Sequence, residues 1–263
     1  MKNLIAIFSI IIILSSCKDS KVKNGAAASN ADTLTTKTFA IDSVKVADSA
    51  VINKNLTSSF TKQLLVFPSI KNKAVLDSIY KVAGIKEKSY DKNSLKAALT
   101  KQMQESFAAS KRDSQDWTPE FKQNWDETST MKLVSLRDNV LTLLYTGSGF
   151  TGGAHGYFFE RYKVFDLNKN KVITLKDLFI NPKDPAWDGI LRSHFEQPEQ
   201  KEMLLVDQIM PNSNFFFDDR KITFVYNEYE ITAYAAGVVY ITINFSEIKN
   251  KLKPEFVAQY KIK

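Results

Sequence analysis

The sequence predicts an α+β protein with two sub-lobes, in which antiparallel sheets carry helices packed on one face. Three patterns indicate this class. Apolar and polar residues alternate near residues 39–66 and again near 222–245, as in half-buried antiparallel strands. Between residues 75 and 107, apolar residues recur at one-turn spacing, as in amphipathic helices. Short apolar runs separated by turn residues fill much of the second half of the chain, as in hairpins.

The chain begins with a segment typical of a bacterial lipoprotein signal. Lys2 gives a positive start, and the apolar run Leu4–Leu14 would rise only roughly 16 Å as a helix, about half of a bilayer core. The next four residues, Leu-Ser-Ser-Cys, resemble a lipobox that ends at Cys17. We therefore expect a signal peptide over residues 1–16 and lipid on Cys17; the alternative is an ordinary secretory signal with an incidental cysteine.

Cysteine content and charge restrict the chemistry of the exported chain. Cys17 is the only cysteine, so its lipidation would leave no thiol for a disulfide or a nucleophile. Removal of Lys2 with the signal would lower the formal net charge from +7 to +6. The basic residues form no block, so we expect a solvated basic surface. The export signal predicts that nucleic acid is not a partner. Attraction to anionic cell-wall polymers or lipid headgroups stays open.

The first half of the chain alternates between strand and helix patterns. Strands are expected at about residues 39–46 and 60–66, followed by helices over 75–83 and 95–107. Residues 113–126 break the helical period with two tryptophans and a proline, and we interpret them as a hinge between lobes.

The second half consists mainly of predicted hairpins. Residues 131–136 and 140–145 flank the turn Arg137-Asp138-Asn139. Further strands are expected at 157–165, 171–175, 222–226 and 239–245, with short helices at 175–179 and 187–195. The small polar residues before about residue 33 cannot bury enough surface to fold. We therefore expect four parts: signal peptide 1–16, lipidated cysteine and flexible tether 17–38, smaller α+β lobe 39–124, and C-terminal α+β domain 125–263.

A glycine-rich segment is the densest local signal. Five of the nine glycines fall within residues 147–156, directly after an apolar strand. Glycine is needed where the backbone adopts positive φ or passes close to another group. We predict that Gly152, Gly153 and Gly156 hold a tight loop before the strand 157–165. The segment lacks the phosphate-binding patterns G-x-x-x-x-G-K-[ST] and G-x-G-x-x-G.

No complete catalytic or metal-binding pattern is visible. His155, in the glycine segment, is expected to lock the turn through hydrogen bonds; its alternative roles are general base and metal ligand. The other histidine, His194, has Glu196 nearby, but zinc needs three or four ligands. Residues 166–177 superficially follow a calcium loop, but Lys171 replaces the required glycine, so we predict a hairpin turn. We expect no metal, no cofactor and no catalytic residue.

Aromatic residues concentrate late in the chain. By strand alternation about half should be core, and the others could form a platform for a protein or a glycan. The aromatic residues in question are Tyr157, Phe158, Phe159, Tyr162, Phe215, Phe216, Phe217, Tyr226, Tyr229, Tyr234 and Tyr240.

Two motifs, Thr-Gly-Gly-Ala-His-Gly at 151–156 and Tyr-Asn-Glu-Tyr-Glu-Ile-Thr-Ala-Tyr-Ala-Ala-Gly at 226–237, carry a family resemblance. Together they make residues 125–252 similar to the RsiV/PdaC C-terminal-type family of domains of unknown function, and residues 39–112 resemble the smaller companion domain that precedes it. The resemblance implies a two-lobed extracytoplasmic α+β module. In RsiV this module binds lysozyme, and in PdaC catalysis belongs to a separate domain, so the resemblance implies binding and supplies no catalytic residue.

We therefore expect a lipid-anchored extracytoplasmic binding or sensing module of the bacterial cell envelope. We expect it at the outer membrane, where it faces either the periplasm or the surface. Its expected ligand is a lysozyme-like protein or a cell-wall glycan such as peptidoglycan. The alternative is a cell-wall hydrolase or deacetylase that uses His155. A basic lysozyme would need a local acidic patch, for which Asp218, Asp219, Glu228 and Glu230 are the candidates. The candidate binding or loop-shaping residues are Gly152, Gly153, His155, Gly156, Tyr157, Tyr226, Glu228, Tyr229 and Tyr234.

Overall fold

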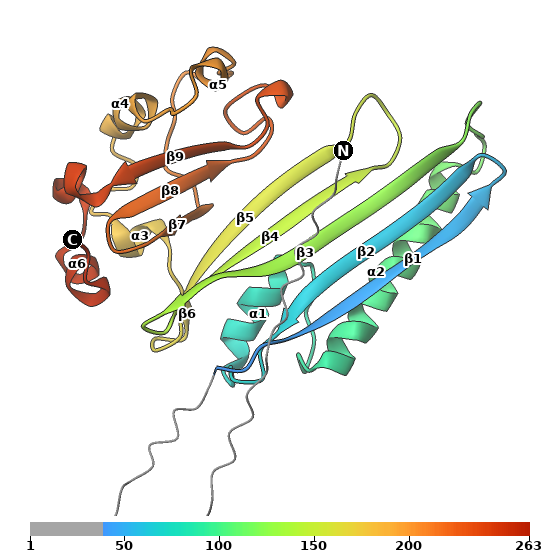
Figure 1. Cartoon of the computed structure of the whole chain (residues 1–263), viewed down its shortest axis with the longest axis horizontal. Coiled ribbons are helices and arrows are strands. Elements are labelled where there is room, and N and C mark those ends of the chain that lie inside the picture. The colour runs from blue at the N-terminus through green and yellow to red at the C-terminus, as the bar shows by residue number, and fades with distance from the viewer. Residues whose placement is uncertain (1–38) are drawn as a thin grey trace, which may run out of the picture. The chain divides into compact units, whose positions relative to one another are not determined.

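The structure is a computed structural model that describes residues 39–263. The predicted signal, the expected lipidation site Cys17 and the predicted tether lie outside the described residues. Within the described part, a six-stranded sheet and a three-stranded sheet each have a hydrophobic core of their own (Figure 1). The predicted α+β class with two sub-lobes is confirmed. Residues 39–263 form one compact unit that contains both cores, so we expect this part of the chain to fold by itself.

The six-stranded sheet has its strands in the order of the sequence. All neighbouring strands are antiparallel except β2 and β3, which are parallel because the two helices between them return the chain to the same end of the sheet. The strands are β1 (Asp42–Asn53), β2 (Leu56–Val66), β3 (Gln123–Arg137), β4 (Val140–Phe150), β5 (Tyr157–Asp166) and β6 (Lys171–Val172).

Helices α1 (Lys73–Lys81) and α2 (Lys92–Asp113) cover one face of this sheet (Figure 1). Asn72 and Asp91 cap their N-termini, since each side chain accepts a hydrogen bond from the backbone N–H three residues later. The buried side chains of α2 include Leu95, which belongs to the same core as Phe60 of β2. Both helices were predicted from their one-turn spacing, and that prediction is confirmed.

The predicted hinge at residues 113–126 is wrong. β3 begins at Gln123 and pairs with β2 from Leu56↔Gln123 to Gln63↔Thr130, so strands on both sides of the expected hinge share one sheet. A change of lobe expected at residues 124–125 would divide a single strand. Sequence periodicity shows where strands lie but not which strands pair, and this pairing is non-local.

The second lobe is built around the antiparallel strands β7 (Phe215–Phe217), β8 (Lys221–Tyr226) and β9 (Val239–Asn244). Its core contains the fully buried Trp187 and Phe224. The surrounding short helices are α3 (Leu175–Leu178), α4 (Ala186–Ser193), α5 (Pro198–Glu202), α6 (Pro254–Tyr260) and the 3-10 turns η1 (Tyr234–Ala236), η2 (Phe245–Glu247) and η3 (Lys249–Lys251).

Two predicted turns are confirmed. Asp138 and Asn139 join β3 to β4 with φ angles of 50° and 62°, as a two-residue hairpin turn requires. Asp166 pairs with Lys171 across the β5–β6 hairpin, which is the turn expected in place of a calcium loop. No helix among residues 39–263 is long and apolar enough to cross a membrane.

Candidate functional site

The predicted glycine loop lies between Phe150 at the end of β4 and Tyr157 at the start of β5. Gly152 and Gly153 have φ angles of +89° and +98°. Residues with a side chain rarely adopt such angles, so the backbone conformation itself requires glycine here. A Cβ atom at Gly153 would have no heavy atom within 4 Å outside its chain neighbours, so the constraint at that position is conformational and not steric.

Other glycines of the cluster allow close packing. A Cβ at Gly156 would lie 2.7 Å from the carbonyl oxygen of Gly149, so a side chain there would force the loop apart. Gly147 and Gly149 lie within β4, where aromatic rings from β5 cover them: a Cβ at Gly147 would overlap the Phe159 ring, and one at Gly149 would lie 2.9 Å from the Tyr157 hydroxyl. Some glycines of the cluster therefore form a loop, and the others form a surface on which aromatic rings pack.

The second motif forms the end of β8, a turn and η1. Tyr229 lies in the turn with a φ of 63°, and it is 58% exposed. The turn is closed by two hydrogen bonds between Asn227 and Glu230, from the Asn227 N–H to the Glu230 carboxylate at 3.1 Å and from the Glu230 N–H to the Asn227 carbonyl at 3.0 Å. A bulky residue at positive φ costs about 1–3 kcal/mol, and such strain is concentrated at functional sites. Tyr229 is strained without being buried.

The two motifs meet in space. The His155 ring stacks on the Tyr234 ring, with centroids 4.0 Å apart and planes at 29°. His155 Nδ1 lies 2.7 Å from the carbonyl oxygen of Gly156, and Nε2 lies 3.3 Å from the Tyr229 hydroxyl. A carbonyl oxygen accepts only, so in the neutral ring Nδ1 carries the proton and Nε2 accepts from Tyr229. We call the rings of His155, Tyr229 and Tyr234 the aromatic cluster.

A groove of about 320 Å³ opens beside the aromatic cluster. Its lining comes from both motifs and from β5, and includes Tyr157, Phe158, Arg161 and Glu228. The Glu228 carboxylate accepts a hydrogen bond from the Phe158 N–H at 3.2 Å, which ties the second motif to the start of β5. The groove therefore combines aromatic surface, one guanidinium and carboxylates.

Two asparagines from the second lobe bond the outer edge of β5. Asn227 Oδ1 accepts from the Glu160 N–H at 2.7 Å, and Asn214 Oδ1 accepts from the Tyr162 N–H at 2.6 Å. The Asn214 amide also donates to the Glu160 carbonyl at 2.8 Å. These side chains supply the hydrogen bonds that a neighbouring strand would otherwise make, and Asn227 thereby fixes the second motif against β5.

Glu160 also accepts side-chain hydrogen bonds from two tyrosines, Tyr162 at 3.3 Å and Tyr240. Burial, followed by the negative charge of Glu160, raises the pKa of Tyr162 to about 12. Burial and then the hydrogen bond to Glu160 likewise raise the pKa of Tyr240. Both hydroxyls therefore stay protonated near neutral pH and act as donors.

The candidate residues divide into three groups. The first group lines the groove and consists of His155, Gly156, Glu228 and Tyr229. Tyr234 stacks on His155 beside the groove, and Gly152 and Gly153 shape the adjacent loop. Tyr157 lines the groove and covers a glycine of β4. Tyr226 is 3% exposed and its hydroxyl donates to the Met210 carbonyl, so it packs in the second core and is not open to a ligand. Sequence reasoning missed Asn214, Asn227 and Glu160.

The remaining histidine is engaged elsewhere. His194 ends α4, with Nδ1 2.8 Å from the Ile190 carbonyl and Nε2 3.0 Å from the Glu247 carboxylate. Among residues 39–263, no group of three His, Asp or Glu side chains is arranged to hold a metal ion. The expected acidic patch is not assembled either, since Asp218 and Asp219 precede β8 whereas Glu228 and Glu230 follow it.

Comparison with known proteins gives one family and two related folds. Residues 176–246 match the family described as "Protein of unknown function (DUF3298)". A crystal structure of a DUF3298 member from Bacteroides fragilis NCTC 9343 is similar, with a TM-score of 0.66, 20% identity, and 86% of this chain and 98% of that chain covered. A DUF3298 protein from Pseudomonas aeruginosa PAO1 has a TM-score of 0.53 and 17% identity, with coverages of 82% and 96%. No curated protein matches the chain. The family match includes the second motif and excludes the glycine loop, and both similar structures come from proteins described as DUF3298.

Proposed function

We propose that this protein is a lipid-anchored binding module of the bacterial envelope that holds a cell-wall glycan at the aromatic cluster without catalysing its conversion. The observation that carries the proposal is the exposed Tyr229, kept at a φ of 63° beside the stacked rings of His155 and Tyr234. A strained, exposed aromatic residue has no role in a core, and its conformation is maintained by the surrounding turn.

The chemistry of the groove suits a saccharide. Sugar rings present apolar C–H faces that pack on flat aromatic side chains, and their hydroxyls pair with charged or polar groups at the edge of a site. Tyr229 and Phe158 supply exposed ring surface, and Arg161 and Glu228 supply polar groups in the same groove. The rings are already fixed by hydrogen bonds and stacking, which lowers the entropy cost of binding.

The rival hydrolase or deacetylase is less well supported. His155 has one nitrogen on the Gly156 carbonyl and the other facing the Tyr229 hydroxyl, and neither contacts a carboxylate that would orient it as a base. Glu228 and Glu230 each accept a backbone N–H hydrogen bond. These carboxylates stabilise the turn, so their geometry favours binding over acid–base chemistry.

A lysozyme-like protein is the second candidate ligand, because the RsiV/PdaC-type resemblance implies it. The four acidic residues proposed for a basic partner are divided between the two ends of β8, and Asp219 is already paired with Lys263 at 2.6 Å. Because these acidic residues do not form one patch, a glycan is favoured over a basic protein as the ligand.

The binding test uses residues 39–263, incubated separately with purified peptidoglycan and with lysozyme, while retention and released products are both measured. We expect retention on peptidoglycan without product release, and a marked loss of retention in Tyr229→Ala. Phe121→Ala is the matched control, since Phe121 is 69% exposed and does not line the groove. Turnover that His155→Ala abolishes would overturn the proposal, and retention on lysozyme alone would replace the glycan with a protein ligand.

The anchor has a separate test. Cells grown with radiolabelled palmitate should label the wild-type chain and leave Cys17→Ala unlabelled. Labelling of the variant would refute the lipid anchor, and fractionation of labelled cells tests the expected outer-membrane location.

A further inference from the structure

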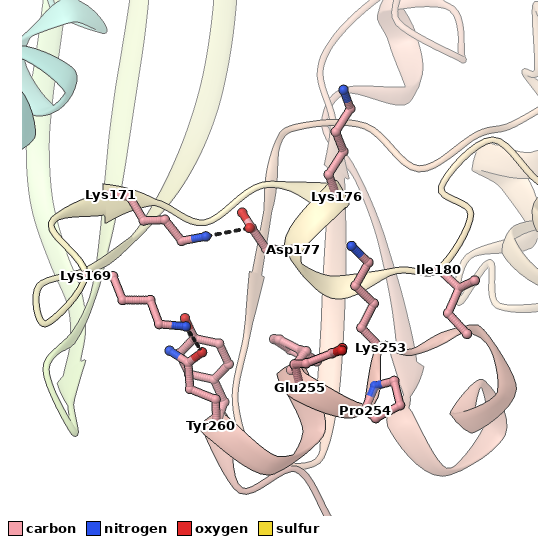
Figure 2. Close-up of a pocket in the computed structure, with 11 residues that line it drawn as sticks. Lys169, Lys171, Lys176, Asp177, Ile180, Lys253, Pro254, Glu255 and Tyr260 are labelled. Carbon is pink, nitrogen blue, oxygen red and sulfur yellow. Dashed lines mark hydrogen bonds and ion pairs between the residues drawn. The ribbon is translucent and has the colours of Figure 1, made fainter.

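A second cleft lies at the other end of β5 from the aromatic cluster. It has a volume of about 440 Å³ and lies among the β5–β6 turn, α3 and α6 (Figure 2). Since β5 is a ten-residue strand, its two ends are about 30 Å apart. The cleft is therefore separate from the groove of the proposed glycan site.

Four lysines and two carboxylates line the cleft: Lys169, Lys171, Lys176 and Lys253, with Asp177 and Glu255. Figure 2 shows the side chains of Lys169 and Lys171 extending from the hairpin toward α3 and α6, and Lys253 rising from the start of α6 toward α3. Lys176 points away from the other three and lies at the edge. Three ammonium groups from two segments distant in sequence thus face one space.

The cleft has surplus positive charge. Lys171 pairs with Asp177 at 2.5 Å, but the second oxygen of that carboxylate already caps α3 through Thr174. Lys169 donates to the neutral amide of Gln259. Within residues 39–263, Lys253 is half-buried and has no ion pair or side-chain hydrogen bond. A partly desolvated ammonium without a partner is costly unless an anion joins it.

Basic residues elsewhere in the same lobe are neutralised in part. Several of them have a carboxylate partner within 3 Å: Lys251 with Asp184, Arg192 with Asp188, and Lys263 with Asp219. A concave site with a surplus of one sign of charge concentrates counter-ions.

We propose that this cleft binds the phosphate group of a phosphate ester. A phosphate has several oxygens that accept from ammonium groups arriving from different directions, whereas a carboxylate has two. Beside the lysines lie Pro254 and Ile180, the latter 62% exposed, so the ester's organic part meets apolar surface. The cleft is too small for a nucleic-acid duplex.

The test compares two charge-matched double variants of residues 39–263. Lys169→Gln with Lys253→Gln removes two charges that face the cleft, and Lys45→Gln with Lys132→Gln removes two exposed charges outside it. Each protein is titrated with inorganic phosphate by NMR. Each is also mixed with vesicles of phosphatidylcholine, with and without phosphatidylglycerol. Circular dichroism melting curves check that both variants fold.

We expect the cleft variant to weaken phosphate binding by about tenfold, while the control weakens it by less than about twofold. Binding of free phosphate without binding to phosphatidylglycerol vesicles would indicate a soluble phosphate ester, and binding to those vesicles would indicate a lipid headgroup. Equal losses in the two variants, or no saturable binding to either probe, would overturn the proposal. Neither result bears on retention of the glycan, which the aromatic cluster determines.

Discussion

Gly153→Ala should destabilise the protein even though the added methyl group has space. The φ angle at this position is +98°, and no heavy atom outside the chain neighbours lies within 4 Å of the point that the alanine Cβ would occupy. The whole effect must therefore come from the backbone. An alanine held at such an angle costs about 1–3 kcal/mol of folding free energy.

Gly189→Ala is the matched control. Gly189 lies within α4, and a Cβ there would likewise meet nothing within 4 Å. Replacing a helical glycine by alanine stabilises a helix by roughly 0.5–1 kcal/mol. The two substitutions add the same atom to equally open space, so the expected difference between them, about 1.5–4 kcal/mol, isolates the backbone conformation.

Thermal and urea unfolding of residues 39–263, followed by circular dichroism, measures both effects. For a chain of this size each kcal/mol shifts the melting temperature by about 2–4 °C, so Gly153→Ala should melt roughly 2–12 °C lower and Gly189→Ala slightly higher than the wild type. Equal melting temperatures for the two variants would refute the argument that conformation limits this loop. Gly153→Ala should also lower retention on peptidoglycan, because the loop carries a ring of the aromatic cluster.

Three further perturbations test the contacts around β5. Gly147→Ala would place a methyl group inside the Phe159 ring and should cost about 1–3 kcal/mol in urea unfolding, part of which Phe159→Ala in the same chain should restore. Asn214→Ala removes the hydrogen bonds to the Tyr162 N–H and the Glu160 carbonyl, and an unfolding free energy lowered by less than about 1 kcal/mol would contradict the bridging role. The pKa of Tyr162, about 12, is above its value of about 10 in an unfolded chain, so its contribution to stability is complete below pH 10 and is lost as the pH rises toward 12. Ultraviolet titration of Tyr162→Phe should lack one phenol that ionises near pH 12.

Local patterns predicted most of the elements because their causes are local. The one-turn spacing of apolar residues from 75 to 107 marks two helices, and Asp138-Asn139 adopts the positive φ angles that a two-residue hairpin needs. Strand β7 and helix α6 were missed because they have three and seven residues, too few to show a period. The hinge was misplaced because the parallel pairing of β2 with β3 depends on contacts more than 60 residues apart.

In the candidate site, too, local motifs could be predicted and contacts between distant residues could not. Each motif was visible in the sequence, but the contact between His155 and Tyr229 crosses 74 residues and has no local signal. The asparagines that bond β5 could not be found, because an asparagine before or after a strand is equally typical of a turn. The packing of aromatic rings on glycines could have been predicted from the sequence. Gly147 and Gly149 alternate on β4, and their partners across the sheet, Phe159 and Tyr157, alternate on β5.

β5 determines how the two proposed sites relate to each other. Near its end, Phe165 belongs to the core of the six-stranded sheet and its neighbour Val164 to the core of the second lobe, so both lobes hold this strand in place. The aromatic cluster and the lysine cleft lie at its opposite ends, about 30 Å apart, which exceeds the Debye length of about 8 Å at physiological ionic strength. Charge in the cleft is therefore screened from the groove. A strand that packs in two cores has no alternative conformation by which binding at one site could change the affinity of the other. Saturating phosphate should consequently leave retention on peptidoglycan unchanged, and a measured change would mean that β5 moves.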